Sequence, residues 1–523
     1  MALEAFWLPL LPAYLIGLLA SWALEALLLP RPQAPWRRGA AANLTHVGVW
    51  TLAFAMEMAL FQRPYFAIAN VLAIELLLVL VSRAKYEALQ EPFVYPDFEY
   101  FTDAIKHPRL YLPFFGWGKA LVCAGGYGVA LWGGLVLEPA ISTRSGGFSA
   151  ATYYLGCGVL ATVGLGTAWL AGRRISVNFD TDQDLIREGL VAALWAYARA
   201  ERAPVDEEIW AHSPFASPPP KSNFPDGLPD LVSIQSESFF DVRRAYPIVR
   251  TDVLSGFDEI CAEAVAYGEL EVAARGANTV RTEFAFLSGI DPERLGVHRY
   301  NPYRKLAKQG GPTLATYLKA LGYRTVCIHP YHGSFYSRNK VLPKLGFDEF
   351  IDIAAFSDAD KVGTYVGDVP LVQKVIGLLS QRSDDQPLYV HVITMENHGP
   401  LHVGLLKDVA DSSVLTENPK EKISDLISYL HHIKNADAMF CELKKYLVSC
   451  GRSAAMCIYG DHIPIMSNIY RLMGSPSGNS NYAVWSNDGN GCGVSHLTTI
   501  ASLAKFFIDV SPVMNPALRR CDK

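Results

Sequence analysis

The sequence predicts an α-helical transmembrane bundle followed by an α/β domain with a mostly parallel sheet covered by helices. Half of the 523 residues are hydrophobic and only 19% are charged, which is low for a purely soluble protein. Long apolar runs occupy the first third of the chain, whereas short apolar runs alternate with helix-like segments in the later part. That alternation is what a parallel α/β sheet requires. A chain of this length is also expected to hold at least two domains.

Five apolar runs in the first third are each long enough for a helix of ~20 residues to cross a bilayer. These runs cover residues 6–29, 45–62, 65–82, 116–137 and 152–171. We therefore expect residues 1–171 to form a transmembrane domain of about five helices. Glu57 and Glu75 lie inside the second and third runs. Each is expected to face the bundle interior, because a carboxylate is costly in hydrocarbon.

Basic residues gather after the first, third and fifth apolar runs and indicate which side of the membrane the later part occupies. They are Arg31, Arg37, Arg38, Arg83, Lys85, Lys106, Arg109, Arg173 and Arg174. The positive-inside rule places these three loops in the cytoplasm, and the chain downstream with them.

Residues 172–227 are expected to form a linker, because they are polar, with one helix-like piece (DQDLIREGLVAALWAYARAE), and end in a stretch rich in Pro and Ser. A globular domain is expected from about Leu228 to residue 515. The net charge of −5 gives no reason to expect a nucleic-acid partner. The nine cysteines include no CxxC pair, which argues against a zinc ribbon and against a disulfide framework.

Four predicted strands of this domain end in residues that can carry acid–base or metal chemistry. LVSIQ is followed by SES with Glu237, and YRTVCI by HPYHGSFYSR with His329, His332 and Arg338. LYVHVITM is followed by ENHGP with Glu396 and His398, and AAMCIY by GDHIP with Asp461 and His462. In open α/β sheets the ligand crevice lies outside the carboxyl ends of the strands. One such residue is more often an ordinary loop residue, but four such ends together favour a shared site.

Oxygen and nitrogen ligands of these types favour Zn²⁺ or Mn²⁺, and a metal can activate a hydroxyl as a nucleophile. Thr279, in RGANTVRTEF, stands at the predicted start of a helix, where a phosphoryl group is also well held. Thr279, Asn278 or Thr282 would each serve as an ordinary helix cap. The residues alone leave the choice between nucleophile and cap open.

The motifs SES, ANTVRTEF, HPYHGSFYSR, MENHGP and YGDH resemble those of the lipoteichoic acid synthase family in order and approximate spacing. That family is a phosphoglycerol-transferase branch of the alkaline phosphatase and sulfatase superfamily. The resemblance covers about residues 228–510 and implies a sulfatase-like catalytic domain over 228–515. It implies one divalent metal, with Mn²⁺ favoured and Zn²⁺ and Mg²⁺ as alternatives.

The resemblance also implies a role for individual residues. The implied metal ligands are Glu237, Thr279, Asp461 and His462, and the family's T-x-x-x-E-F pattern selects Thr279 over Thr282 as the catalytic nucleophile. The implied substrate-binding residues are His329, Tyr336, Arg338 and His398.

Two positions depart from the family pattern and leave the headgroup specificity open. Tyr336 stands where the family has Trp, and Tyr331 stands where it has an acidic or amide residue. The sulfatase motif C-x-P-x-R is absent at the position of the nucleophile, which counts against a sulfatase activity.

The implied function is transfer of a phosphoglycerol headgroup from a phosphatidylglycerol-like donor to a glycan or glycolipid acceptor through a phosphothreonine. The alternatives are a phosphoethanolamine transferase of the same superfamily and an inactive, membrane-anchored glycan-binding scaffold. The resemblance implies a multi-pass protein of the bacterial cytoplasmic (inner) membrane with its catalytic domain outside, which conflicts with the basic loops. The acceptor and a role for Arg281 are left unassigned.

Overall fold

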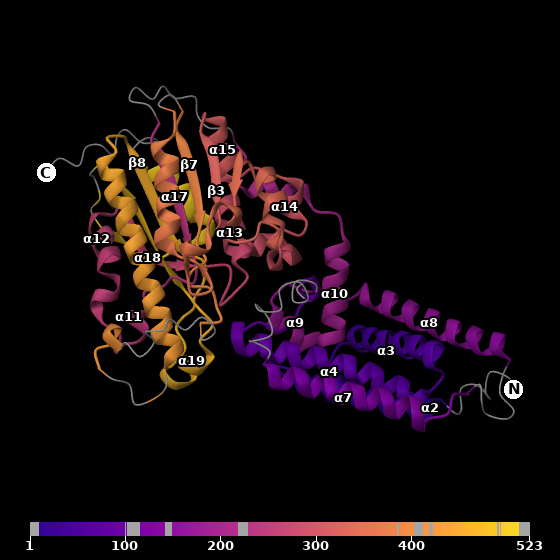
Figure 1. The fold of residues 1–523 in the computed structure, drawn as a ribbon. Coiled ribbons are helices and arrows are strands. Elements are labelled where there is room, and N and C mark those ends of the chain that lie inside the picture. Colours follow the sequence, from indigo (N-terminus) through magenta and orange to yellow (C-terminus); the bar gives the residue numbers. More distant parts are fainter. Residues whose placement is uncertain are drawn as a thin grey trace. The chain divides into compact units, whose positions relative to one another are not determined.

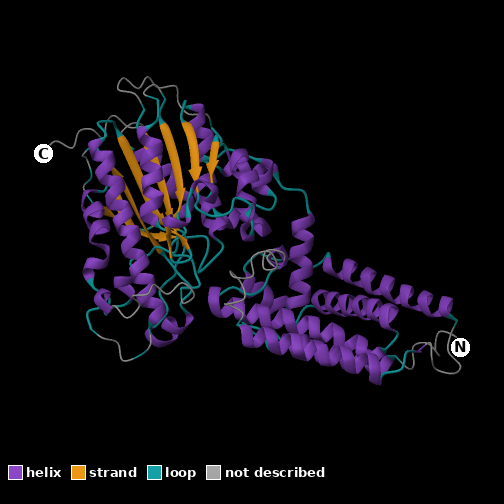
Figure 2. Cartoon of the chain, viewed as in Figure 1, coloured by secondary structure: helices purple, strands orange, loops and turns teal. Residues whose placement is uncertain are grey.

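The structure is a computed structural model that divides the chain into two compact units, Met1–Ala203 and Pro204–Lys523. The first unit is built of helices, and the second contains a sheet with helices on both faces (Figures 1 and 2). The residues that the structure describes are 10–99, 101, 116–141, 149–217, 228–383, 386–401, 412–417, 421, 423–488, 491 and 493–511.

Helices lie at all five predicted membrane runs of the first unit. They are α2 (Leu11–Glu25), α3 (Ala40–Phe61), α4 (Pro64–Leu89), α7 (Trp117–Leu137) and α8 (Ala150–Gly172). Of these, α3, α4 and α8 are long and apolar enough to cross a membrane, whereas α2 and the part of α7 from Leu121 to Leu137 are shorter apolar helices. The chain is therefore a membrane protein, and the number of five spans stays a prediction.

Small residues let α3 and α8 pack with their backbones in contact. A Cβ atom placed on Gly48 would lie 2.5 Å from the backbone nitrogen of Ala168, and one on Gly164 would lie 2.7 Å from the nitrogen of Leu52. Close approach through small residues is the usual means by which membrane helices associate. A larger side chain at either glycine is therefore expected to separate the two helices.

The two carboxylates predicted inside the spans differ in burial. Glu75 is buried, and its Oε1 accepts a hydrogen bond from the Ser21 hydroxyl at 2.9 Å. Glu57 is half-buried and accepts a hydrogen bond from Asn70 Nδ2 at 2.6 Å. The predicted inward orientation is thus confirmed for Glu75.

Ser21 also connects Glu75 to a buried ion pair. Its hydroxyl lies 2.8 Å from His46 Nε2, and His46 Nδ1 lies 3.6 Å from Glu25 Oε1. Arg38 Nη1 donates to Glu25 Oε2. We call Ser21, Glu25, Arg38, His46 and Glu75 the membrane-unit network; all five are buried.

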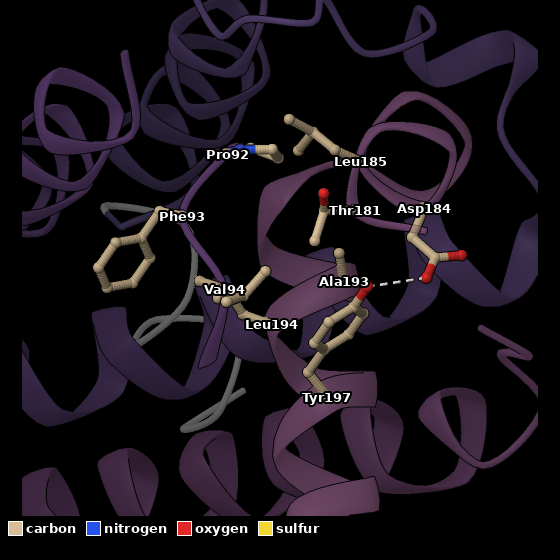
Figure 3. Close-up of a pocket in the computed structure, with 9 residues that line it drawn as sticks. All are labelled: Pro92, Phe93, Val94, Thr181, Asp184, Leu185, Ala193, Leu194 and Tyr197. Atoms are coloured by element: carbon tan, nitrogen blue, oxygen red, sulfur yellow. Dashed lines mark hydrogen bonds between the residues drawn. The ribbon is translucent and has the colours of Figure 1, made fainter. Parts of the chain in front are cut away.

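The predicted linker, 172–227, is wrong in its first part. Residues Thr181–Glu188 (α9) and Leu190–Arg202 (α10) are helical and belong to the first unit, because α10 buries apolar residues such as Leu190 and Tyr197 at helical spacing. Figure 3 shows a small cavity between these helices and the segment Pro92–Val94. The Pro-rich residues 218–227 lie outside the described part of the chain.

The second unit contains a nine-stranded sheet with the order β10-β2-β9-β8-β1-β7-β3-β4, and β11 pairs with β2. Its strands are β1 (Asp230–Ser236), β2 (Ala266–Glu271), β3 (Arg324–Ile328), β4 (Glu349–Ile351), β7 (Leu388–Ile393), β8 (Ala454–Gly460), β9 (Ser480–Ser486), β10 (Val494–Ser495) and β11 (Thr498–Thr499). The four predicted strands are β1, β3, β7 and β8. They are neighbours and run parallel, so their carboxyl ends meet at one edge. Strand β9 runs antiparallel to both of its neighbours, which makes the sheet mixed.

Helices cover both faces of this sheet because its central strands are apolar on both sides. In β1, Leu231 contributes to one hydrophobic cluster and Val232 to the other. The cluster that includes Val232 is completed by α12 (Ser255–Glu263), α17 (Asp368–Ser380) and α18 (Ser424–Ser449). The cluster that includes Leu231 is completed by α13 (Thr279–Ser288), α15 (Leu314–Ala320) and α20 (Ile500–Val510). Shorter elements are α11 (Val242–Ala245), α14 (Leu306–Gln309), α16 (Arg338–Val341), α19 (Ser467–Met473) and a hairpin of β5 (Lys361–Val362) and β6 (Tyr365–Val366).

Candidate active site

Three of the predicted metal ligands come together where β1 and β8 end. Glu237, Asp461 and His462 are buried, and each offers one ligand atom within 4.8 Å of the others. His462 Nε2 lies 3.3 Å from Asp461 Oδ2 and 3.7 Å from Glu237 Oε1. Parallel pairing of β1 with β8 places Ser236 beside Gly460, and so brings the residues that follow them together.

The backbone after β1 is shaped to hold these carboxylates. Ser238 has a left-handed conformation (φ 55°). Its N–H donates to Asp461 Oδ1 at 2.8 Å and its hydroxyl donates to Glu237 Oε1 at 2.9 Å. Gly460 permits the approach, since a Cβ there would lie 1.9 Å from the carbonyl oxygen of Phe239. Any other residue at 460 is therefore expected to disturb the site.

The cluster fits a divalent cation. Asp461 Oδ2 is buried and has no hydrogen-bond partner among the described residues, which is costly unless another group compensates it. Burial, together with the nearby Asp461 carboxylate, raises the pKa of Glu237 to about 8. Two carboxylates and one imidazole form a donor set that suits Mn²⁺ or Zn²⁺.

The predicted nucleophile lies on a helix that is attached to this cluster. Thr279 is the first residue of α13 and is buried. Thr282, one turn later, donates its hydroxyl hydrogen to the Asp461 carbonyl oxygen at 2.8 Å. Residues three apart share a helix face, so Thr279 lies on the side of α13 that faces Asp461. The Asn278 side chain makes no hydrogen bond that caps the helix, which leaves its amino end available to an anion.

Arg338 is buried but already paired. Its Nη2 donates to Glu283 Oε2 at 2.8 Å and its Nε donates to the same oxygen at 3.2 Å. Glu283 Oε1 accepts from the Tyr303 hydroxyl at 2.5 Å. Arg338 Nη1 lies 3.3 Å from His329 Nε2.

The contacts of His329 and His398 show which of their ring nitrogens carry a hydrogen. A guanidinium only donates, so His329 Nε2 is unprotonated, and Nδ1 donates to the Ile393 carbonyl oxygen at 3.2 Å. Burial and the Arg338 guanidinium lower the pKa of His329 well below its usual range. His398 is half-buried, and its Nδ1 donates to the Gly399 carbonyl oxygen at 2.7 Å. Burial lowers the pKa of His398, which also interacts electrostatically with Asp461 and Arg338.

Aromatic rings connect these two histidines. The Tyr331 ring lies 6.2 Å from His329 and 6.2 Å from Tyr365, and Tyr365 lies 5.6 Å from His398, with distances taken between ring centroids. Tyr336 has a left-handed backbone (φ 53°), and its ring lies 5.2 Å from the Arg338 guanidinium carbon. A non-glycine residue in this conformation is strained, and such strain concentrates at functional sites.

A second group of buried polar residues interacts with Glu237 and was not predicted from the sequence. Glu396 Oε1 accepts from His432 Nδ1 at 2.9 Å, and Glu396 Oε2 accepts from the Asp368 N–H at 2.7 Å. The Asp368 carboxylate is 1% exposed, and neither oxygen has a hydrogen-bond partner among the described residues. Burial, with the Glu396 and Glu237 carboxylates, raises the pKa of Asp368 well above its usual range. Only Glu396 followed a predicted strand; His432 and Asp368 lie on helices without a recognisable motif.

Arg281, which had no predicted role, contacts Tyr300. Its Nε donates to the Tyr300 carbonyl oxygen at 3.0 Å, and its guanidinium carbon lies 5.1 Å from the Tyr300 ring. This contact ties α13 to the segment Pro292–Tyr300. His332, which also follows β3, is exposed.

The second unit is similar to known proteins. Residues 269–498 match the family model described as Sulfatase. The capsular polysaccharide biosynthesis protein RkpI of Rhizobium meliloti (strain 1021) is 27% identical over 448 residues, which cover 82% of this chain and 78% of that protein. Lipoteichoic acid synthase 1 of Bacillus subtilis (strain 168) is 29% identical over 156 residues, covering 29% of this chain but only 23% of its own length.

A solved structure resembles the chain over nearly its whole length. The integral membrane protein lipooligosaccharide phosphoethanolamine transferase A (EptA) from Neisseria meningitidis aligns with a TM-score of 0.55 at 12% identity and covers 95% of each chain. At this level of identity the likeness concerns the fold, a helical membrane region followed by an α/β domain.

Proposed function

We propose that this chain, a membrane protein with a sulfatase-family domain related to lipoteichoic acid synthases, transfers a phosphoglycerol headgroup from a phospholipid to a glycan or glycolipid. The observation that carries the proposal is the buried cluster of Glu237, Asp461 and His462 beside the helix that begins at Thr279. A hydroxyl at a helix amino end next to metal-type ligands suits phosphoryl transfer.

In this proposal one divalent cation, with Mn²⁺ favoured, would be held by Glu237, Thr279, Asp461 and His462. The chemistry that the bound cation supplies is stabilisation of the threonine alkoxide and of phosphoryl charge. Thr279 Oγ attacks phosphorus; the Oγ–P bond forms while the bond from phosphorus to the diacylglycerol oxygen breaks, and the threonine proton passes to that oxygen. An acceptor hydroxyl then attacks phosphorus, the Thr279 Oγ–P bond breaks, and the acceptor proton returns to Thr279.

His398 is the better candidate for moving these protons. Both ring nitrogens of His329 are engaged, one with Ile393 and one with Arg338, so His329 is suited to orienting neighbours. His398 engages one nitrogen with a backbone carbonyl and interacts with Asp461. Burial lowers the pKa of His398, which favours the neutral ring that can accept a proton as a general base.

We further propose that the catalytic unit lies outside the cytoplasmic membrane, where glycan acceptors are found. The basic loops indicate the opposite side. However, α2 and the Leu121–Leu137 part of α7 are shorter than the other apolar helices. If α7 does not span, the basic loops before it keep their side and the chain after α8 lies on the opposite one, whereas loss of α2 alone would not change the side. Alkaline phosphatase or green fluorescent protein fused after Ala203 tests this: phosphatase activity supports the outside location, and fluorescence alone contradicts it.

The transfer proposal is tested with the purified full chain and a fluorescent phosphatidylglycerol analogue. Thr279→Ala is expected to abolish release of diacylglycerol, whereas Thr282→Ala is expected to retain it. If Thr279→Ala kept full activity, the nucleophile would be wrong. If the wild-type chain bound no metal and cleaved no phospholipid, the glycan-binding scaffold would be the better interpretation.

A phosphoethanolamine donor is the second candidate, and a specific observation favours it. The buried Asp368 carboxyl group lacks a hydrogen-bond partner among the described residues, and an ammonium group would supply one and stabilise the ionised form. The Tyr331 and Tyr365 rings nearby could also contact a cation through their faces. Parallel assays with fluorescent phosphatidylglycerol and phosphatidylethanolamine decide between the two donors, and Asp368→Asn should weaken only use of the second.

A further inference from the structure

A buried carboxylate joins the helix of Thr279 to the residues expected to bind the headgroup. Glu283 lies one helical turn after Thr279 on α13. Its two oxygens accept hydrogen bonds from Tyr303 and from Arg338, and the Arg338 and Glu283 side chains are 1% and 0% exposed. From Arg338 the contacts continue through His329 to the carbonyl oxygen of Ile393 at the end of β7.

We propose that Glu283 is a positioning residue for headgroup transfer, which acts by holding Arg338 in one orientation towards the donor phosphate. This inference rests on the proposed function, since it concerns the same site. Glu283 itself contacts side chains only and is not a catalytic residue.

The hydrogen bonds of the guanidinium show which of its nitrogens still have an N–H group for substrate. A guanidinium has five N–H groups, one on Nε and two on each Nη nitrogen. Glu283 engages Nε and one N–H of Nη2, and His329 accepts one N–H of Nη1. One N–H on each Nη nitrogen is left, and these are the donors that can bind phosphate oxygens.

The charge of Glu283 is as necessary as its shape. A buried guanidinium without a partner is strongly unfavourable, and an unpaired Arg338 would turn towards other acceptors. Burial lowers the pKa of the Arg338 guanidinium, but the Glu283 carboxylate raises it by more, so the net shift is upward and Arg338 stays charged. The same pair keeps His329 Nε2 unprotonated, since Arg338 donates to it.

Position on the helix explains why one residue can serve both parts of the site. Residues four apart lie on the same helix face, so Thr279 and Glu283 point to the same side of α13. A shift of α13 would move the nucleophile and the phosphate-binding arginine together. The distance between the attacking oxygen and the held phosphate is thereby kept constant.

The test measures donor KM and kcat of the full chain in detergent with a fluorescent phosphatidylglycerol analogue. Glu283→Gln keeps the shape and removes the charge. It is expected to raise the donor KM and to lower kcat/KM by roughly tenfold or more, as loss of an orienting partner does elsewhere. Tyr303→Phe is the matched control, because it removes the other hydrogen bond to Glu283 and leaves the arginine pair; its KM should stay at the wild-type value.

A double-mutant cycle shows whether Glu283 acts through Arg338. If it does, Glu283→Gln/Arg338→Gln should be no worse in kcat/KM than Arg338→Gln alone. If the kcat/KM losses of the two single variants multiply in the double variant, the inference is wrong. It is also wrong if Glu283→Gln folds well and keeps the wild-type KM. If Glu283→Gln does not fold, Glu283→Asp decides, because it keeps the charge and withdraws the carboxylate: an unchanged KM contradicts positioning.

The proposed function and this inference fail in different ways. If Thr279→Ala is as active as the wild type, the proposed function is wrong whatever Glu283 does. If Thr279→Ala is inactive and Glu283→Gln behaves as the wild type, only the inference about Glu283 is wrong.

Discussion

Two regions of the molecule bury clusters of charged side chains, and they treat those charges differently. In the membrane-unit network each carboxylate has a donor: Glu25 pairs with Arg38, and Glu75 accepts from Ser21. His46 Nδ1 has no hydrogen-bond partner among the described residues, but it lies 3.6 Å from Glu25 Oε1. In the candidate active site, Asp461 Oδ2 and both oxygens of Asp368 have no hydrogen-bond partner among the described residues. Both regions are equally well buried.

The difference indicates which buried charges stabilise the fold and which bind a ligand. A buried polar group without a partner costs free energy, so a protein retains one chiefly where another molecule or ion supplies the partner. Paired buried charges instead hold helices in one arrangement, and removing one partner is strongly destabilising. On this view the membrane-unit network supports the fold, and the carboxylates around Asp461 bind ligands.

The largest effect is expected at Asp461. Asp461→Asn should lose the bound divalent metal, and transfer activity with it, because a neutral amide replaces a ligand carboxylate. Metal content of the purified full chain, measured by mass spectrometry, checks this. Asp368→Asn is the matched control and should keep its metal, since Asp368 is not among the grouped ligands. Equal metal loss in both variants would contradict the distinction between them.

Removal of one partner in the membrane-unit network should destabilise the fold without changing the chemistry. Arg38→Met leaves Glu25 buried with an unpaired charge and is expected to cost about 3–5 kcal/mol. Arg38→Met/Glu25→Leu removes both charges and should recover most of that loss. Thermal unfolding in detergent measures the stability. Lower activity per folded molecule in these variants would show that the network serves the reaction.

The metal should stabilise the protein more at pH 8 than at pH 6. The pKa of Glu237 is about 8 in the folded, metal-free protein, above the value near 4.3 expected when unfolded. In the metal-free protein, the contribution of Glu237 to the free energy of unfolding is therefore fully present below pH 4 and is lost as the pH rises to 8. Metal binding must displace the proton, so the apparent affinity should fall by roughly tenfold per pH unit below 8.

Thermal unfolding with and without Mn²⁺ at the two pH values measures this effect. Glu237→Gln serves as the control, because it removes one titrating ligand and should weaken the pH dependence of any remaining shift. An equal Mn²⁺ shift at pH 6 and pH 8 in the wild type would mean that Glu237 is not a ligand.

Much of the catalytic unit could be predicted from the sequence, because apolar runs followed by polar motifs identify buried parallel strands and their carboxyl ends. The family predicted from those motifs is confirmed, and β8, β1, β7 and β3 are adjacent and parallel. The roles of the site residues stay predictions. The residues that were missed have partners far away in the chain: Glu283 meets Arg338 across 55 positions, and Glu396 meets His432 across 36. Single-sequence patterns carry no information on such pairs.

The linker prediction was wrong for a different reason. The segment of α9 and α10 is polar on average, yet α10 places Leu190, Ala196 and Tyr197 on one buried side. The helix-like character of this segment was recognisable in the sequence, but its average polarity gave no sign that it packs into the first unit.

The smallest expected effect separates the two threonines of α13. Thr282→Val removes one hydrogen bond to the Asp461 carbonyl oxygen and should cost about 1–3 kcal/mol of stability. Its metal content should stay normal, because Thr282 contacts the backbone of Asp461 and not its carboxylate. Thr279→Val should show the opposite: nearly unchanged stability, since the Asn278 region is not capped by a side chain, but no transfer. If Thr282→Val lost the metal and Thr279→Val did not lose activity, the hydroxyl that the active site needs would be Thr282, and the assignment from the family pattern would have to be reversed.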